Sequence, residues 1–496
     1  MADSRDVGAA GRLGQSAVRE RRRLAHVVDA ELIGGSRWCL AAYATMVAGA
    51  GALFLLIRRY GETLAAPAPA VIAATGIARD APALAAPNAL LHVLLALAAV
   101  VVAGRILGRL FRWIGQPPVV GEVIAGILLG PSLLGRIAPG AAAYVLPSSV
   151  APSLGVVAQL GVMLYMFLVG LQLNAGLLRG RAHATVATSH ASIVAPFVLG
   201  SLLALFLYPR LSTSAVPFTS FALFMGVAMS ITAFPVLARI LTDCGIAQTD
   251  LGVVALTCAA ADDVTAWCLL AFVIGIAQAK VEGALAVVAL AIGFIATMFL
   301  AVRPLAARLL ARPGDRAPGR EAIALALVCM LFSALATEWI GVHAIFGAFL
   351  FGVVIPHDSG LARILTERLE DLVVVLLLPA FFAFTGMRTR IDLVTGAPAW
   401  LSCGLVILVA TTGKFAGTFA AARLTGMDWR GAASLGILMN TRGLMELVVL
   451  NIGLDLGIIS PALFTMMVLM AVATTVATTP MLGLVSSARV RYNRPF

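Results

Sequence analysis

The sequence predicts an all-α polytopic membrane protein that contains two inverted five-helix repeats with paired broken helices. Composition, the length of the apolar runs and an internal repeat support this fold class. Of 496 residues, 61% are hydrophobic and 12% are charged, whereas a soluble protein carries about 25% charged residues. No globular core of this length could hide so much apolar surface from water. The composition therefore excludes a soluble enzyme, a secreted disulfide scaffold and a disordered tail protein.

Apolar runs of membrane-spanning length recur along the chain. A helix needs about 20 residues to cross a hydrocarbon core of about 30 Å. Fourteen runs approach or exceed this length, with approximate bounds 38–57, 88–107, 118–135, 152–171, 186–208, 217–241, 250–277, 284–302, 320–338, 342–356, 371–387, 398–422, 431–453 and 461–485. The first run is not a cleavable signal peptide, because a long charged tail precedes it and Arg58-Arg59 follows it.

The distribution of positive charge predicts how these spans are oriented. The chain has 35 Lys and Arg residues against 24 Asp and Glu. They lie in short loops rather than on one clustered face, so nucleic acid is not an expected partner. If the N-terminus is cytoplasmic, about three times as many of them fall on the cytoplasmic side as outside. This bias favours a cell-membrane protein with both termini cytoplasmic, a basic tail at 1–37 and a short tail at 486–496.

A glycine pattern occurs twice, seven spans apart. Gly121, Gly126 and Pro131 in one span match Gly347, Gly352 and Pro356 in another. The span after each of these ends on a matching glycine, at positions 170 and 386. Because the offset is an odd number of spans, the two units enter the membrane from opposite sides. Spans 3–7 and 10–14 then form an inverted repeat, which is typical of secondary transporters; the alternative is coincidence among glycine-rich helices.

The fourth span of each repeat carries a helix interruption. One interruption contains a proline, which removes an amide donor and disfavours helix at the preceding residue. The other is a polar cluster within apolar sequence. Their residues are Thr232, Ala233, Phe234 and Pro235 in one span, and Asn440, Thr441, Arg442 and Gly443 in the other. Matching breaks in matching spans indicate a binding site at the centre of the membrane.

Three charged residues lie near the middle of predicted spans. A charge at the bilayer centre costs at least about 2.5–3.5 kcal/mol, so such residues usually serve function. Asp262 and Asp263 lie in the span 250–277, and Lys414 lies in the span 398–422. Two adjacent buried carboxylates cannot both ionise cheaply unless a cation neutralises them.

These residue types suit an alkali cation that competes with protons. Asp263, with Asp262, the Thr232 hydroxyl and nearby unwound carbonyls, could replace the hydration shell of Na⁺ or K⁺. Lys414 could pair with Asp262 when the metal ion leaves, and could release a proton. The alternative for this pair is an Asp–Lys bridge that only locks helices together. No cofactor is expected, since the six cysteines show no metal-ligand spacing.

A second charged pair lies at the predicted break in the span 431–453. Arg442 and Glu446 are four residues apart, so they can pair along one helix face. We favour a structural role, in which the pair neutralises the broken helix, over direct contact with the ion.

Cation/proton exchange is the function that these residues favour, and three alternatives remain open. A sodium-coupled solute symporter with a related broken-helix fold would need a further polar cluster for its substrate. An intramembrane aspartyl protease would need its two aspartates on facing helices, whereas Asp262 and Asp263 are adjacent. A passive channel would leave the charge pair unexplained.

Residues 88–485 resemble the monovalent cation:proton antiporters of the larger Na⁺/H⁺ exchanger superfamily. The resemblance is carried by three stretches, residues 116–131, TAFPVLAR at 232–239 and NTRGLMELVVLNIG at 440–453, and they are similar to the branch with plant and fungal cation/proton exchangers. It implies the sodium/proton antiporter fold in a homodimer embedded in the bilayer. In that family a six-helix core moves like an elevator past a dimerisation domain. Here the core helices would come from 152–277 and 371–485, and the remaining spans would form the dimerisation scaffold.

The resemblance also assigns roles to the three charged residues. Asp263 matches the essential carrier of cation and proton, and Asp262 and Lys414 match the ion-pair partners of electrogenic members. The plant and fungal branch usually has Asn where this chain has Asp262. Members with Asp-Asp and Lys tend to move two protons per cation, so electrogenic exchange is expected. The helix 38–57 is an addition to a thirteen-helix plan, and gating through a soluble nucleotide-sensing domain or a long tail is not expected.

Overall fold

The fold is described from a computed structural model covering residues 43–68, 89–172, 182–278, 281–310 and 319–485. The chain divides into two compact units, residues 1–53 and 54–496. In the first unit, residues 43–53 are helical, and the second unit begins with helical residues 54–61. The predicted tails 1–37 and 486–496, and the start of the predicted helix 38–57, lie outside the described residues.

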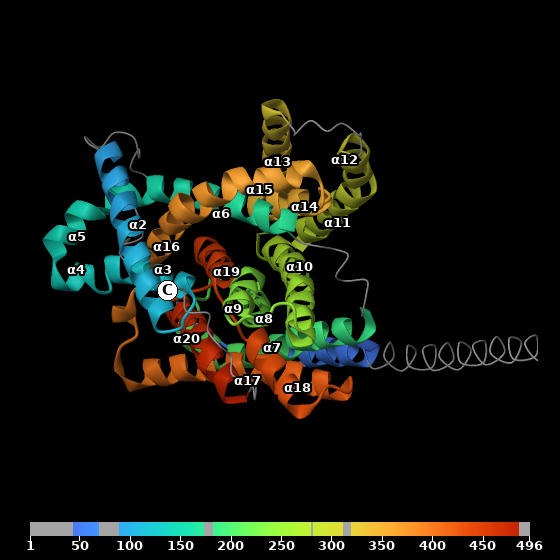
Figure 1. The fold of residues 1–496 in the computed structure, drawn as a ribbon. Helices are drawn as coiled ribbons and strands as arrows, with labels where there is room; N and C mark the ends of the chain where they lie inside the picture. The colour runs from blue at the N-terminus through green and yellow to red at the C-terminus, as the bar shows by residue number, and fades with distance from the viewer. Residues whose placement is uncertain (1–42, 69–88, 173–181, 279–280, 311–318, 486–496) are drawn as a thin grey trace, which may run out of the picture. The chain divides into compact units, whose positions relative to one another are not determined.

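The second unit is helical, and its arrangement is drawn in Figure 1. Its elements in chain order are α2 (Ala89–Trp113), α3 (Pro118–Leu129), α4 (Leu134–Ile137), α5 (Pro139–Val145), η1 (Ser148–Val150), α6 (Ala151–Gln172), α7 (Ala182–Leu211), α8 (Phe218–Ser230), α9 (Phe234–Asp243), α10 (Asp250–Gln278), α11 (Val281–Thr297), η2 (Met298–Val302), α12 (Arg303–Leu310), α13 (Arg320–Ile340), α14 (Ala344–Val354), α15 (Gly360–Leu372), η3 (Val373–Leu377), α16 (Leu378–Arg388), η4 (Ile391–Leu393), α17 (Gly396–Leu424), α18 (Trp429–Met439), α19 (Leu444–Asp455) and α20 (Pro461–Val485).

Within the described residues, the number of candidate membrane spans is lower than the fourteen expected from the sequence. In the described ranges, eleven helices are long and apolar enough to cross a membrane, and the bent pair α18–α19 makes twelve. The predicted span 342–356 corresponds to α14, which has 11 residues. At 1.5 Å per residue this helix is only about 16 Å long, which is shorter than the hydrocarbon core of a bilayer. The predicted span 38–57 is described only from residue 43 onward.

The two glycine motifs of the repeat form two close helix crossings. A Cβ on Gly126 of α3 would lie 2.1 Å from the carbonyl oxygen of Phe382 in α16. A Cβ on Gly352 of α14 would lie 2.3 Å from the carbonyl oxygen of Phe167 in α6. Helix backbones can approach this closely only where small residues stand at the crossing. The first helix of each repeat therefore packs against the second helix of the other repeat, so the two crossings are equivalent.

Both predicted breaks occur in the structure, and they touch. The helix of α8 ends at Ser230 and α9 begins at Phe234, with extended backbone at Ile231 and Ala233. Pro235 lies in the first turn of α9, where its missing N–H costs no hydrogen bond. The second break separates α18 from α19, with a bend of 43°. The backbone N–H of Ala233 donates to the carbonyl oxygen of Thr441 across 3.0 Å, which joins the two breaks.

Two groups of helices can be distinguished by their packing. The first group, which we name the site group, contains α7, α8–α9, α10, α17, α18–α19 and α20, and α7 packs against α8, α10 and α17. The second, the flanking group, contains α2, α3, α6, α13, α14 and α16. The helices α6 and α16 pack most extensively on α14 and α3 of the flanking group. They fall in the segments 152–171 and 371–387 that were expected in the core, and the division into core and dimerisation scaffold stays a prediction.

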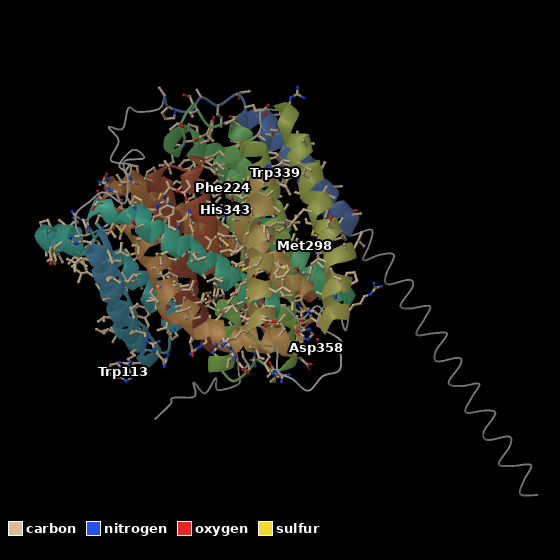
Figure 2. The ribbon with its side chains drawn as sticks, turned by 90° about the horizontal axis from the view of Figure 1, so that it is seen from above. Trp113, Phe224, Met298, Trp339, His343 and Asp358 are labelled. Carbon is tan, nitrogen blue, oxygen red and sulfur yellow. The ribbon has the colours of Figure 1, made fainter. Side chains whose placement is uncertain are left out.

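Exposed tryptophans lie at the ends of several helices. Trp113 at the end of α2 and Trp339 near the end of α13 are 86% and 83% exposed. Figure 2 shows Trp113 and the exposed Asp358 near one edge of the helix bundle, and Trp339 toward the other. Tryptophan is enriched where a helix meets the membrane–water interface. These positions agree with helices that cross a bilayer between the two edges.

Candidate ion-binding site

Asp262 and Asp263 lie in the middle of α10, beside the point where the two broken helices meet. Both side chains are fully buried, as is the side chain of Lys414. The helix α10 packs against α7, α8, α9 and α18, so both halves of the first broken helix touch it. Successive residues on a helix point about 100° apart. The two neighbouring carboxylates therefore face different surroundings.

Asp262 is surrounded by hydrogen-bond donors. Its Oδ1 accepts from the Ser189 hydroxyl at 2.7 Å. Its Oδ2 lies within reach of the hydroxyls of Ser192 at 2.7 Å and Thr232 at 3.0 Å, and of Lys414 Nζ at 2.9 Å. Bonds from an ammonium group and from hydroxyls favour the ionised carboxylate. Each oxygen of Asp262 thus has at least one hydrogen-bond donor beside it.

Lys414 uses all three of its N–H bonds. In addition to Asp262, its Nζ donates to the carbonyl oxygens of Ser192 at 3.0 Å and Ser230 at 2.6 Å. An ammonium group has three donors and no acceptor. This buried side chain is therefore held as a cation between α7, α8 and α10.

Asp263 has none of these partners. Neither carboxylate oxygen makes a hydrogen bond to any residue in the described part of the chain, although both are buried. The backbone N–H of Phe234, at the start of α9, lies near this carboxylate. A buried carboxylate without a partner is costly unless a proton or a cation occupies it. Asp263 therefore has the properties of a site for an exchangeable positive ion.

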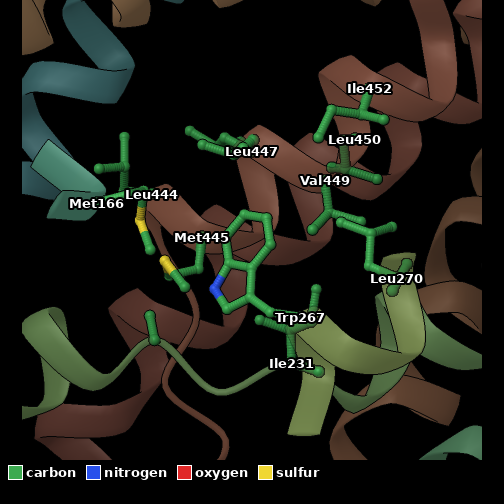
Figure 3. Packing of buried hydrophobic residues seen from close by; sticks show 14 of the residues in the cluster. Met166, Ile231, Trp267, Leu270, Leu444, Met445, Leu447, Val449, Leu450 and Ile452 are labelled. Carbon is green, nitrogen blue, oxygen red and sulfur yellow. The ribbon is translucent and has the colours of Figure 1, made fainter. Parts of the chain in front are cut away.

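Apolar side chains cover the region next to Asp263. Trp267, one helical turn further along α10, is 3% exposed and stacks at a tilt on Phe349 of α14. Figure 3 shows its indole ring beside Met445 and below Leu447 of α19. These side chains exclude water, and a low local dielectric strengthens every charge interaction at the site. The indole Nε1 has no hydrogen-bond partner among the described residues.

The C-terminal end of α8 is capped by two cations. Arg442 donates from Nη1 to the carbonyl oxygen of Ala228 at 2.9 Å and from Nη2 to that of Met229 at 2.6 Å. Lys414 caps the next carbonyl, that of Ser230. The last carbonyls of a helix have no partner within the helix and carry partial negative charge. The two cations therefore stabilise a helix end buried inside the protein.

Arg442 also forms a fully buried salt bridge with Glu446. The Nη1–Oε2 distance is 2.8 Å, and both side chains are completely covered. The backbone of Arg442 is held in turn by Thr475 of α20, whose hydroxyl donates to the Arg442 carbonyl oxygen at 2.6 Å. The pair therefore belongs to the framework of the second break. Among the described residues, Glu446 has Arg442 as its hydrogen-bond partner and forms no hydrogen bond with either aspartate.

The three other residues of the second break, Asn440, Thr441 and Gly443, have different surroundings near the crossing of the two breaks. Thr441 contributes its carbonyl oxygen to Ala233, while its hydroxyl makes no hydrogen bond within the described ranges. Asn440 is 6% exposed and lines a cavity of about 140 Å³ between α17, α18 and α20. Gly443 sits where a Cβ would lie 2.6 Å from a methyl group of Val236. The broken segments therefore pack closely against each other.

Sequence reasoning missed Ser189 and Ser192 of α7. Their hydroxyls supply two of the four polar contacts of Asp262. A signal was present, because two serines three residues apart in an apolar span share one helix face. This pattern did not show which charged residue the two serines would contact, because only the tertiary structure brings α7 next to α10.

The comparisons with known proteins agree with this geometry. Residues 95–485 match the family model described as "Sodium/hydrogen exchanger, transmembrane". The chain belongs to the sodium/hydrogen exchanger family. It is 42% identical over 397 residues to the Na(+)/H(+) antiporter NhaS4 of Synechocystis, a match that covers 79% of this chain and 97% of that relative.

Relatives in plants and yeast match the same part of the chain. Identity is 39% to Cation/H(+) antiporter 20 of Arabidopsis thaliana, over 77% of this chain and 47% of the relative. It is 35% to K(+)/H(+) antiporter 1 of Saccharomyces cerevisiae, over 76% of this chain and 44% of the relative. The chain thus spans about half the length of these two proteins.

A solved structure has the same fold. The sodium proton antiporter MjNhaP1 from Methanocaldococcus jannaschii superposes with a TM-score of 0.63, covering 81% of this chain and 100% of the other. Sequence identity is only 12%. This likeness therefore establishes the sodium/proton antiporter fold, and not the ion or the mechanism.

Proposed function

We propose that this protein exchanges a monovalent cation, Na⁺ or K⁺, for protons by alternating access to a site at Asp263. The observation that carries the proposal is the fully buried Asp263 carboxylate, which has no hydrogen-bond partner among the described residues and lies beside two crossed helix breaks in a member of the sodium/hydrogen exchanger family. The relatives are named as Na⁺/H⁺, K⁺/H⁺ and cation/H⁺ antiporters, which favours exchange over sodium-coupled symport.

Competition for one carboxylate links the two ions. A proton makes buried Asp263 neutral, and an alkali cation bound there makes the site neutral by charge pairing. The two forms exclude each other. If the site opens to one side of the membrane at a time in either occupied form, cation movement in one direction drives proton movement in the other.

The exchange is proposed to be electrogenic, with Lys414 supplying a second proton. Lys414 is held as a cation by Asp262 and two carbonyl oxygens in the present arrangement. A metal ion that enters beside the aspartates weakens the attraction between Asp262 and this ammonium group. Lys414 then loses its proton, and two protons leave for each cation bound.

The movement that changes access is proposed to be a displacement of the site group past the flanking group. The two aspartates, Lys414 and both helix breaks all belong to the site group. Glycine-mediated contacts of α3 with α16 and of α14 with α6 lie within the flanking group, which favours a rigid frame. The homodimer expected from the family would form through this frame.

The decisive experiment measures proton flux in liposomes containing the purified protein, after addition of Na⁺, K⁺ or Li⁺. We expect exchange by the native protein, with a rate that depends on a clamped membrane potential. Asp263→Asn keeps the shape of the side chain but can bind neither a proton nor a cation as a carboxylate does, so we expect exchange to fall to the rate of liposomes without protein.

Asp358→Asn is the matched control, because this carboxylate is exposed at the edge of the bundle. It should retain the native rate. Exchange at the native rate by Asp263→Asn would contradict the assignment of Asp263 as the carrier. If the exchange rate of the native protein did not depend on the membrane potential, the two-proton scheme would be contradicted.

A further inference from the structure

We propose that Ser189 of α7 is a positioning residue that makes the two neighbouring aspartates unequal. Its hydroxyl donates a hydrogen bond to one oxygen of Asp262. Of the two carboxylates, only that of Asp263 then binds a proton in competition with the cation. This inference rests on the exchange function proposed above. In the proposed exchange, Ser189 contacts neither the Asp263 carboxylate nor the transported cation.

The contacts of Asp262 divide unevenly between its two oxygens. Oδ2 lies within reach of three donors, from Ser192, Thr232 and Lys414. Oδ1 has one partner in the described part of the chain, the Ser189 hydroxyl at 2.7 Å. Losing one donor to Oδ2 leaves two others, whereas losing Ser189 leaves Oδ1 unpaired.

Two of the donors to Oδ2, Ser192 and Thr232, each have a second acceptor within reach. Ser192 Oγ lies 2.8 Å from the carbonyl oxygen of Ser189, and Thr232 Oγ1 lies 3.1 Å from that of Met439. Each hydroxyl has a single hydrogen, so it can serve Asp262 or a carbonyl but not both. In the described part of the chain, Ser189 donates to Asp262 and to no second acceptor. Within those residues, its hydroxyl is therefore the dedicated neutral donor to this carboxylate.

The charges around Asp262 come from several elements. Lys414 of α17 pairs with it, and Asp263 lies next to it on α10. The Cys258 thiol of α10 and the Arg442 guanidinium from the second break are within electrostatic range of this pair. When Lys414 loses its proton during exchange, the hydroxyls are the remaining donors. Ser189 then keeps Asp262 ionised at the step when a second proton could otherwise bind there.

Without Ser189, Asp262 Oδ1 resembles the oxygens of Asp263, which are buried and unpaired. Protons then compete at both carboxylates. A hydrogen bond to a charged group changes a binding equilibrium by about tenfold or more. Cation exchange should therefore need more alkaline conditions.

The test is a pH profile of exchange in liposomes for Ser189→Ala. We expect the pH of half-maximal exchange to rise by about one unit or more. The apparent KM for the cation at the native half-maximal pH should rise about tenfold, with the maximal rate at alkaline pH retained. A residue that merely supports packing would lower the maximal rate without moving the profile.

Two further variants at position 189 and one control sharpen the result. Ser189→Thr retains the hydroxyl and should keep the native profile, and Ser189→Cys, a weak donor of similar size, should shift it upward. Ser201→Ala removes a buried hydroxyl of the same helix that donates to the Ala222 carbonyl oxygen, and should leave the profile unchanged.

A native pH profile in both Ser189→Ala and Ser189→Cys would overturn the inference while exchange by the native protein still supported the proposed function. No exchange by the native protein would instead overturn the function itself. If Ser189→Ala does not fold, the shift in Ser189→Cys decides, because that variant keeps nearly the native volume.

Discussion

At the scale of single residues, two adjacent aspartates have opposite surroundings. Asp262 is met by hydroxyls and an ammonium group, whereas Asp263 has no hydrogen-bond partner in the described residues. The two residues are neighbours in the chain, but successive residues on a helix point about 100° apart. Asp262 therefore points toward α7 and α17, whereas Asp263 lies beside the crossing of the two helix breaks.

The buried pair Arg442–Glu446 permits a prediction about stability. Replacing Arg442 by Gln leaves the Glu446 charge without its partner and frees the carbonyl oxygens of Ala228 and Met229. An unpaired buried charge costs about 3–5 kcal/mol. Arg442→Gln should therefore greatly lower the thermal unfolding temperature in detergent.

Glu446→Gln is the matched comparison at the same salt bridge. A glutamine can still accept from Arg442 Nη1, and the arginine keeps both carbonyl partners, so the cost should be about 1–3 kcal/mol. Unfolding temperatures measured side by side should place Glu446→Gln between Arg442→Gln and the native protein. The reverse order would contradict the view that Arg442 mainly caps α8.

At the scale of elements, the glycines of the repeat determine how closely its helices approach. Gly352 of α14 and Gly170 of α6 lie against each other, and a Cβ on either would come within 3.0 Å of the other residue's Cα. Gly352→Ala should therefore separate α14 from α6 and lower the unfolding temperature or the yield of folded protein.

A glycine in open space provides the control for this substitution. Gly404 lies in the middle of α17, and nothing is within 4 Å of the Cβ that alanine would add. Alanine is favoured over glycine inside a helix by about 0.5–1 kcal/mol. Gly404→Ala should be neutral or slightly stabilising, and equal loss in both variants would show that the crossing tolerates a side chain.

At the scale of the whole molecule, a movement between the two helix groups can be tested by cross-linking. Trp267 of α10 belongs to the site group and Phe349 of α14 to the flanking group, with ring centroids 6.4 Å apart. In a background without the native cysteines, Trp267→Cys with Phe349→Cys, joined by a short thiol cross-linker, should stop exchange. Cleavage of the linker should restore it.

A second pair tests whether cross-linking by itself is harmful. Phe167 of α6 and Phe351 of α14 both belong to the flanking group, with centroids 6.0 Å apart. Phe167→Cys with Phe351→Cys should keep exchanging after cross-linking. Full activity of the linked pair at 267 and 349 would exclude displacement between the two groups.

The sequence by itself determined the membrane class, the paired breaks and the inverted repeat. Apolar length, proline, and glycine at fixed spacing act locally on the chain, so they can be recognised without the fold. Fourteen spans were expected and up to twelve candidates are found in the described residues, in part because composition did not show that the helix within 342–356 has only 11 residues.

Only the tertiary structure decided which charges meet. Ser189 and Lys414 are 73 and 152 residues from Asp262 in the chain, yet both contact its carboxylate. Packing of α17 on α7 and of α7 on α10 brings them together, and helix packing also places α6 and α16 on α14 and α3. Contacts over such separations arise from how helix faces fit, and local patterns carry no information about that fit.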